Sequence, residues 1–143
     1  MQSSLNILLV VGSIFSITAA LLHFACIFWG APMFRFLGAG EPVVQMAAEG
    51  HWYPNFIAFA VGALLSVWSL YALSGAGVIA QLPYARAALS VITFIYLLRA
   101  VAFPLLKPAF PGNSDTFWLA SSAICLIIGL VHFFGLRQVW EHI

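Results

Sequence analysis

The chain has 143 residues, of which 64% are hydrophobic and 6% charged, and its formal net charge is +1. Soluble domains carry about 25% charged residues, so this composition excludes an ordinary soluble protein and indicates an integral membrane protein. A net charge this small provides no basic face for nucleic acid. The length allows a single domain over residues 1–143, with helices of roughly 20 residues each across a hydrocarbon core of about 30 Å.

Apolar runs predict a bundle of four transmembrane helices, at about residues 5–29, 54–73, 83–103 and 116–140. The first run lacks a preceding Lys or Arg and is too long for a signal peptide, so we expect it to remain as a span. Small and polar residues recur at steps of three and four on one face of three helices. Such stripes allow close helix approach and predict inward-pointing faces. They comprise Gly12, Ser16, Ala19, His23, Cys26 and Gly30; His51, Asn55, Ala58, Gly62, Ser66 and Ser69; and Trp118, Ser122, Cys125, Gly129 and His132.

The longest interruption of the apolar pattern predicts a short helix at about residues 42–49. Pro42 is typical of a first helical position, and Gly50 is typical of the position just past a helix end. Trp52 and Tyr53 follow, an aromatic pair typical of a membrane interface. We therefore expect a short interfacial helix between the first two spans, held against the mouth of the bundle.

Alternate crossing of the membrane places both termini on one side and the connections after the first and third helices on the other. Arg86 and Arg137 flank spans on the terminus side, and Arg35 and Lys107 do so on the other, so the Lys/Arg count does not set the orientation. The prolines, aromatics and carboxylates of the connections favour cytoplasmic termini. The size and polar stripes resemble those of small four-helix inner-membrane proteins of bacteria, and we expect that membrane here.

Arg99 lies in the apolar third helix, where an arginine at the span centre costs about 2.5–3.5 kcal/mol, so its head must face a polar interior or reach the interface. We expect a pocket on the connection side that binds a lipid-like or apolar small molecule through its anionic group, with Arg99 holding that group. If chemistry occurs there, His23 or His51 is the expected general acid or base and Glu49 orients it. The predicted ligand-binding residues, at similar depth, are His23, Glu49, His51, Asn55, Tyr96 and Arg99.

A structural alternative stays open. In it, Glu49, Glu41 or Asp115 neutralises Arg99 and pins the connection onto the bundle, which closes the pocket. An alternative function is that of a non-catalytic structural or partner subunit of a larger membrane complex. A transporter or channel role would require a homo-oligomer or an added subunit, since a transport pathway needs more helices than this chain supplies. The residue pattern does not decide whether the protein is an enzyme or which cofactor it would use.

The cysteines and histidines do not predict a metal site. HxxxH, CxxC and ExxH spacings are absent. His23 and His132 are predicted toward opposite membrane sides, which disfavours a haem or metal between them. Cys26 and Cys125 lie inside apolar runs and are expected to be buried free thiols.

Overall fold

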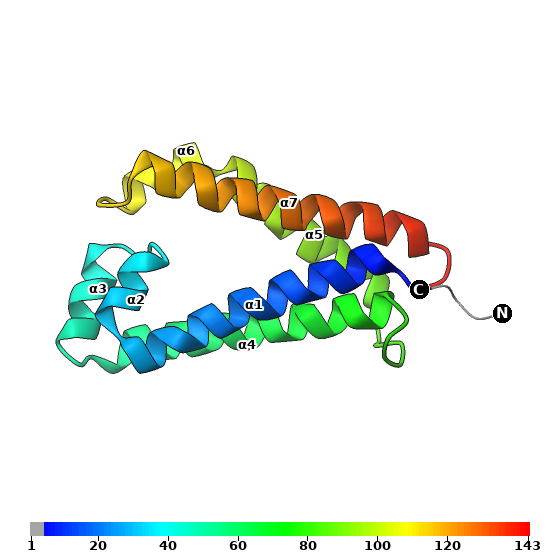
Figure 1. The fold of residues 1–143 in the computed structure, drawn as a ribbon, viewed down its shortest axis with the longest axis horizontal. Coiled ribbons are helices and arrows are strands. Elements are labelled where there is room, and N and C mark those ends of the chain that lie inside the picture. Colours follow the sequence, from blue (N-terminus) through cyan, green and yellow to red (C-terminus); the bar gives the residue numbers. More distant parts are fainter. Residues whose placement is uncertain (1–4) are drawn as a thin grey trace.

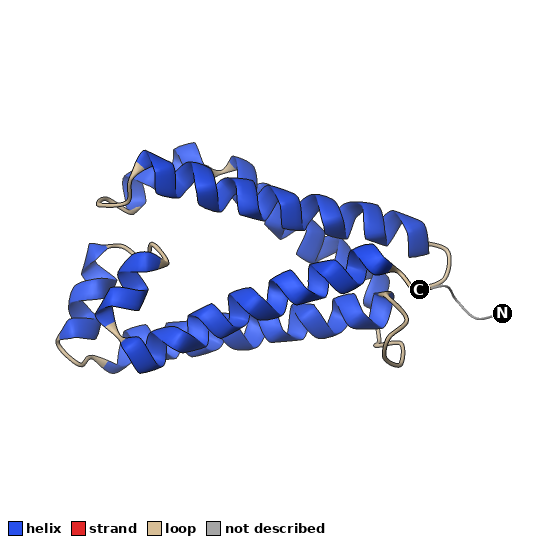
Figure 2. Ribbon diagram, in the orientation of Figure 1, coloured by secondary structure: helices blue, strands red, loops and turns tan. Residues whose placement is uncertain are grey.

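The computed structural model describes residues 5–143, and every regular element in that range is helical (Figure 2). Helices α1 (Ile7–Trp29), α4 (Trp52–Gly75) and α7 (Asp115–Val139) are each long and apolar enough to cross a membrane. Helix α5 (Ala85–Val101) and the segment that follows it meet the same criterion together, as one span bent by 65°. The described chain is therefore an all-helical membrane protein with three candidate spans, or four when the bent pair counts as one.

Two short helices, α2 (Ala31–Phe36) and α3 (Glu41–Ala48), connect α1 to α4. Helix α3 confirms the predicted helix between the first two spans, whereas α2 was not predicted. Gly30 ends α1 with a φ of +65°, and Pro32 lies in the first turn of α2, where its missing N–H breaks no helical hydrogen bond. A new helix can therefore begin directly after α1.

The predicted third span, residues 83–103, is interrupted near its end. Helix α5 stops at Val101, and the chain continues as α6 (Phe103–Leu106) and the 3-10 turn η1 (Lys107–Ala109). Pro104 lies in the first turn of α6, where it cannot extend the hydrogen-bond ladder of α5. The resulting bend turns α6 away from the axis of α5 at the end opposite the termini.

The four long helices pack as two pairs (Figure 1). Helix α1 packs along α4, and α5 packs along α7; these pairs are termed the α1–α4 arm and the α5–α7 arm. The arms meet at the end that holds both termini, the terminal end, and diverge toward the tip end, which carries α2, α3 and α6. The predicted bundle is thus present, but it is fully packed only in its terminal half.

The predicted small-residue faces point inward at their central glycines, whereas His51 and Asn55, at the start of the stripe on α4, are exposed. Each of three stripe glycines lies so close to a neighbouring helix that an added Cβ would overlap a side chain there. These Cβ positions lie 2.7 Å from Cε1 of His132 for Gly12, 2.5 Å from Cε1 of Phe24 for Gly62, and 2.6 Å from Cδ2 of Leu97 for Gly129. Glycine is needed at these positions because it lets the helix backbones approach closely.

Hydrogen bonds between helices hold the terminal half together. Ser13 and Ser69 pair at 2.7 Å between Oγ atoms and join α1 to α4. Ser16 Oγ and the Tyr96 hydroxyl lie 2.9 Å apart and join the two arms. Because hydrocarbon offers no partner to a hydroxyl, these groups favour the packed state.

Asn6 anchors the start of α1, and Asn6→Ala is expected to lower the free energy of unfolding by about 1–2 kcal/mol. Its Oδ1 accepts from the backbone N of Leu9 at 2.9 Å, and its Nδ2 donates to Gly135 O at 3.2 Å and Gln138 Oε1 at 2.8 Å. The measurement is SDS titration in mixed micelles. Thr18→Ala is the control, because the exposed Thr18 hydroxyl bonds only within its own helix. An equal loss for both variants would contradict an anchoring role.

Candidate functional site

Arg99 lies in the last turn of α5, on the α5–α7 arm, and is partly buried. Its Nη2 donates to Ser121 Oγ at 3.2 Å and its Nη1 to Ser122 Oγ at 3.4 Å. Its Cζ lies 5.3 Å from the centre of the Trp118 ring. Ser121 and Ser122 are five to six residues from the middle of α7, so the guanidinium lies about 8 Å from mid-span. With the bilayer centred on the middle of α7, that depth is within the hydrocarbon half-thickness of about 15 Å.

We term Arg99 and its three neighbours on α7 the arginine cluster; these neighbours are Trp118, Ser121 and Ser122. The side chains of this cluster offer more hydrogen-bond donors than acceptors. A guanidinium has five N–H groups, and here two of them donate, both over long distances to neutral hydroxyls. The other three have no protein partner among residues 5–143. The indole N–H of Trp118, whose side chain is only 3% exposed, also lacks an acceptor in the described structure. The cluster is chemically matched to a group rich in acceptor oxygens.

No carboxylate of the described chain neutralises Arg99. The four carboxylates lie elsewhere: Glu41 accepts from Arg35 at 3.0 Å, Glu49 accepts from Gln45 at 3.0 Å, Asp115 pairs with Lys107, and Glu141 is exposed beyond α7. The expectation that Glu49, Glu41 or Asp115 pairs with Arg99 is therefore wrong. The physical reason is that the first two belong to the tip of the other arm and the third is closer to a cation of its own connection.

His23 lies at the depth of the arginine cluster, on the opposite arm. Gly12 of α1 contacts His132 of α7 where the arms meet. His23 follows Gly12 by eleven residues and Ser121 precedes His132 by eleven, in both cases toward the tip end. Eleven residues of an α-helix make about 1,100°, close to three full turns, so a side chain eleven residues further on points in almost the same direction. The same eleven residues advance the helix by about 16 Å. His23 and Ser121 thus lie on facing sides of the two arms.

The imidazole of His23 is oriented by its own helix. Its Nδ1 lies 2.7 Å from the carbonyl oxygen of Ala19. Because a carbonyl only accepts, Nδ1 carries the hydrogen of this bond, and in the neutral ring Nε2 is left as an acceptor. The ring is partly buried. His23 is therefore held ready to interact through Nε2.

Tyr96 lies in the packed terminal half, one turn of α5 closer to the terminal end than Arg99. Its ring centre is 5.2 Å from that of Trp68 and 5.3 Å from that of His132. Its hydroxyl is already bonded to Ser16. Tyr96 thus joins the arms below the arginine cluster.

Glu49, His51 and Asn55 are all exposed, around the end of α3 and the start of α4. Asn55 precedes Trp68, which packs on Tyr96, by thirteen residues, or about 20 Å along α4. The structure therefore brings Arg99 and His23 to the same depth on facing arms, and it leaves these three residues apart from them.

Sequence reasoning missed Ser121 and did not connect Trp118 and Ser122 with Arg99. A usable signal exists. Helices α5 and α7 pack along each other, and in the predicted spans Arg99 lies four residues before the end of residues 83–103 while Ser121 lies five residues after the start of residues 116–140. Comparing the depths of residues on these two antiparallel helices would have paired Arg99 with the hydroxyl groups of Ser121 and Ser122.

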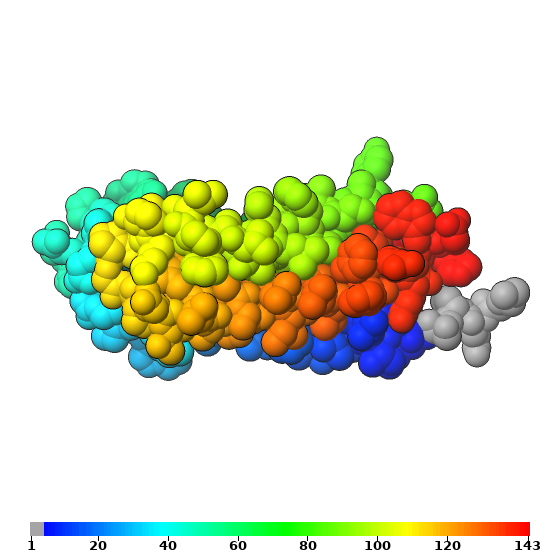
Figure 3. Space-filling view, turned by 90° about the horizontal axis from the view of Figure 1, so that it is seen from above, coloured from blue at the N-terminus to red at the C-terminus, as the bar shows by residue number. Residues whose placement is uncertain are grey.

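The arms touch again at their tips, where the α2–α3 connection reaches the chain before and at the start of α7. Seen from above, the chain before α7 (yellow) overlies part of the tip formed by α2 and α3 (cyan) (Figure 3). Three interactions form this tip contact: the Phe117 ring covers Gly38, the Phe110 ring lies 3.2 Å from the position of a Cβ on Gly40, and Asn113 Nδ2 donates to Gly38 O at 3.1 Å. Both rings also pack on Trp118, with centroid distances of 5.7 Å for Phe117 and 6.3 Å for Phe110. The tip contact and the arginine cluster therefore share one aromatic group.

Other candidate sites are weaker. Within residues 5–143, no three His, Cys, Asp or Glu side chains come close enough to hold a metal ion. The thiols of Cys26 and Cys125 are free. A groove of about 370 Å³ lies between α4 and α5, lined by residues that include Trp68, Tyr71 and Tyr84. Its lining is almost entirely apolar and contains none of the six predicted site residues.

The chain matches no protein-family model, no curated protein and no solved structure.

Proposed function

We propose that this small multi-span membrane protein binds a lipid-like or apolar molecule that carries an anionic group, and that the arginine cluster holds this group. One observation carries the proposal: Arg99 is a partly buried cation inside a candidate span, and its partners among residues 5–143 are all neutral. A charge in hydrocarbon is costly, and a bound anion offsets that cost. The planar guanidinium suits a carboxylate or phosphate because it donates two parallel hydrogen bonds.

The remainder of the ligand is proposed to lie between the diverging arms. His23 faces the cluster across this space and supplies a second polar contact. The apolar part of the ligand packs against the hydrophobic side chains of the spans, in keeping with pockets that combine apolar walls with a few polar groups. This arrangement keeps His23, Tyr96 and Arg99 of the predicted site and adds Trp118, Ser121 and Ser122.

A partner-subunit function has less support. Large hydrophobic side chains are exposed along the candidate spans, among them Phe28, Phe59, Phe94 and Leu119. Contact with lipid requires such side chains, so they do not by themselves indicate a protein partner. The unpaired guanidinium is the more specific feature, and it indicates an anion.

Lipid and metabolite analysis of the purified full-length protein tests the proposal. Wild type is expected to retain an enriched anionic amphiphile, and Arg99→Gln is expected to lower its occupancy at least tenfold, about 1.4 kcal/mol of binding free energy. Arg99→Lys should be intermediate, because an ammonium keeps the charge but lacks the planar fork. His23→Leu should reduce occupancy less than Arg99→Gln does, because it removes a weaker neutral contact. Occupancy is measured by native mass spectrometry and by quantification of the extract.

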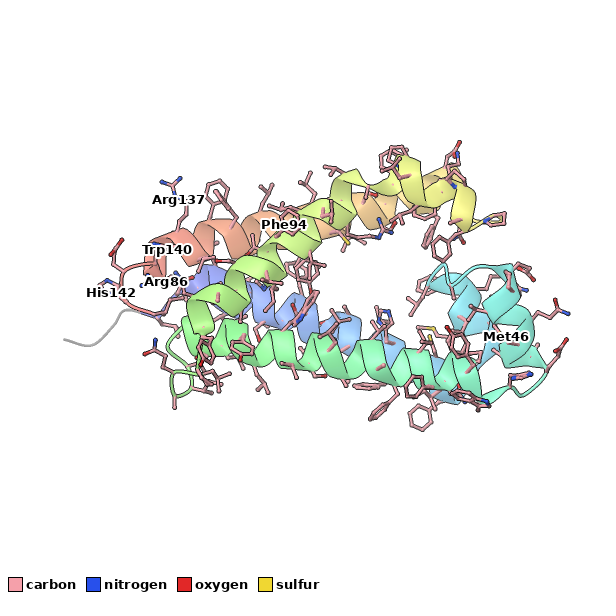
Figure 4. All side chains as sticks on the ribbon, turned by 180° about the vertical axis from the view of Figure 1, so that it is seen from behind. Met46, Arg86, Phe94, Arg137, Trp140 and His142 are labelled. Atoms are coloured by element: carbon pink, nitrogen blue, oxygen red, sulfur yellow. The ribbon has the colours of Figure 1, made fainter. Side chains whose placement is uncertain are left out.

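Arg137→Gln is the matched control, because Arg137 is exposed in the last turn of α7 and projects away from the bundle (Figure 4). It should leave occupancy unchanged. An unenriched wild type, or equal occupancy in the Arg99→Gln variant, would contradict the proposal. A stoichiometric co-purifying protein that is lost in Arg99→Gln would instead support the partner subunit.

A further inference from the structure

We infer that the bound anion is a single carboxylate on a single-chain amphiphile, as in a free fatty acid. This inference rests on the proposed function and narrows it to one ligand class. Three features of the arginine cluster carry it: its charge, its depth in the span, and the side from which it can be approached.

The arginine cluster holds one positive charge. Of the other four Lys and Arg residues, Arg35 and Lys107 pair with carboxylates at the tips. Arg86 donates to the backbone oxygen of Ile143 at 2.8 Å and 3.1 Å and stacks on Trp140 at the terminal end, where Arg137 projects outward (Figure 4). One guanidinium balances one carboxylate. A phosphomonoester carries about −1.5 to −2 at neutral pH and would leave negative charge in the hydrocarbon.

The depth of the cluster excludes the headgroup of a resident phospholipid. The guanidinium lies about 8 Å from mid-span, whereas the polar headgroup region begins about 15 Å from the bilayer centre. The phosphate and glycerol of a phospholipid would have to move inward by about 7 Å to reach the guanidinium. This movement is unfavourable because both polar groups would lose their hydration. A carboxylic acid has no such anchor, and it is uncharged when protonated. It can therefore reach this depth from within the bilayer.

The approach to the cluster is from the bilayer. On the tip side, Phe110 and Phe117 pack over Trp118 and against the α2–α3 connection. On the terminal side, the packed layer of Ser16, Tyr96 and His132 joins the arms. The remaining side is the lateral one, where the ribbons of the two arms diverge (Figure 1) and where the Arg99 side chain is only partly buried. A lateral route favours an apolar carrier over a small water-soluble anion.

Three probes with the same sixteen-carbon chain separate the headgroup chemistries: hexadecanoate, hexadecyl phosphate and hexadecanol. The full-length protein is placed in nanodiscs of phosphatidylcholine, and occupancy is measured by native mass spectrometry at equal probe content. Hexadecanoate is expected to exceed hexadecanol at least tenfold and hexadecyl phosphate at least threefold. Arg99→Gln should lower hexadecanoate to the level of hexadecanol, whereas Arg137→Gln should not change it. Circular dichroism and gel filtration check folding. If Arg99→Gln does not fold, Arg99→Lys is used in its place and is expected to lower hexadecanoate occupancy only partly, because it keeps the charge and loses the planar fork.

The outcomes distinguish this inference from the proposed function. Tighter, Arg99-dependent binding of hexadecyl phosphate would overturn the carboxylate and leave the proposed function standing. Stronger Arg99-dependent retention of a two-chain phosphatidylglycerol than of hexadecanoate would likewise overturn the single-chain carboxylate and leave the proposed function standing. Equal binding of all three probes, with no effect of Arg99→Gln, would overturn both.

Discussion

Gly12→Ala is expected to lower the free energy of unfolding by about 1–3 kcal/mol, and Gly12→Val by more, because both overpack the junction of the two arms. The added Cβ would lie 2.7 Å from Cε1 of His132. The His132 side chain is 0% exposed, and its Nδ1 lies 2.8 Å from the carbonyl oxygen of Ile128, so the ring has no free space into which to move. The helices themselves must separate to accept the methyl group.

A double-mutant cycle with His132→Ala isolates this contact. In the His132→Ala background the Cβ of Gly12→Ala no longer meets a ring, so its cost should fall to a few tenths of a kcal/mol. SDS titration in mixed micelles measures each variant. Ile17→Ala, at a lipid-exposed position of α1, is the control and should have a small effect. If Gly12→Ala costs the same in both backgrounds, the clash with His132 is not its cause.

The inward faces of the helices could be predicted because lipid leaves small and polar groups no alternative. A glycine or serine stripe in an apolar helix predicts close packing, and Gly12, Gly62 and Gly129 confirm it. The connections were less predictable. Helix α2 is too short for a periodic pattern. Pro104 predicts that a helix ends near residue 103, but it does not predict the 65° bend with which the chain continues as α6.

The candidate site was predictable only in part. Arg99 is conspicuous in the sequence because a charge inside an apolar helix requires an explanation. Grouping Asn55 and Glu49 with it assumed that residues at equal depth lie close together, which holds only if all helices stay in contact along their length. The arms instead diverge toward the tips, and this divergence arises from tertiary packing that no helical stripe records.

The tip contact offers a test of how the divergent ends are held together, and Gly38→Ala is expected to open it. Gly38 has a φ of +74°, so any Cβ there costs about 1–2 kcal/mol in backbone conformation alone. The added Cβ would also overlap the Phe117 ring. We expect overpacking to add about 1–3 kcal/mol to the loss of stability.

Gly50→Ala is the matched control, because Gly50 ends α3 with the same hydrogen-bond pattern as Gly38 at the end of α2, has a similar φ of +76°, and has no atom within 4 Å of the Cβ position. Spin labels on the exposed residues Ala48 and Ala109 report the distance between the tips. Gly38→Ala should lengthen this distance and Gly50→Ala should not; equal distances in the two variants would refute the role of Phe117. Because Phe117 also packs on Trp118, at 5.7 Å between ring centres, opening the tips should loosen the aromatic floor beneath Arg99. Gly38→Ala is therefore expected to lower amphiphile occupancy as well, although Gly38 lies on the other arm from Arg99.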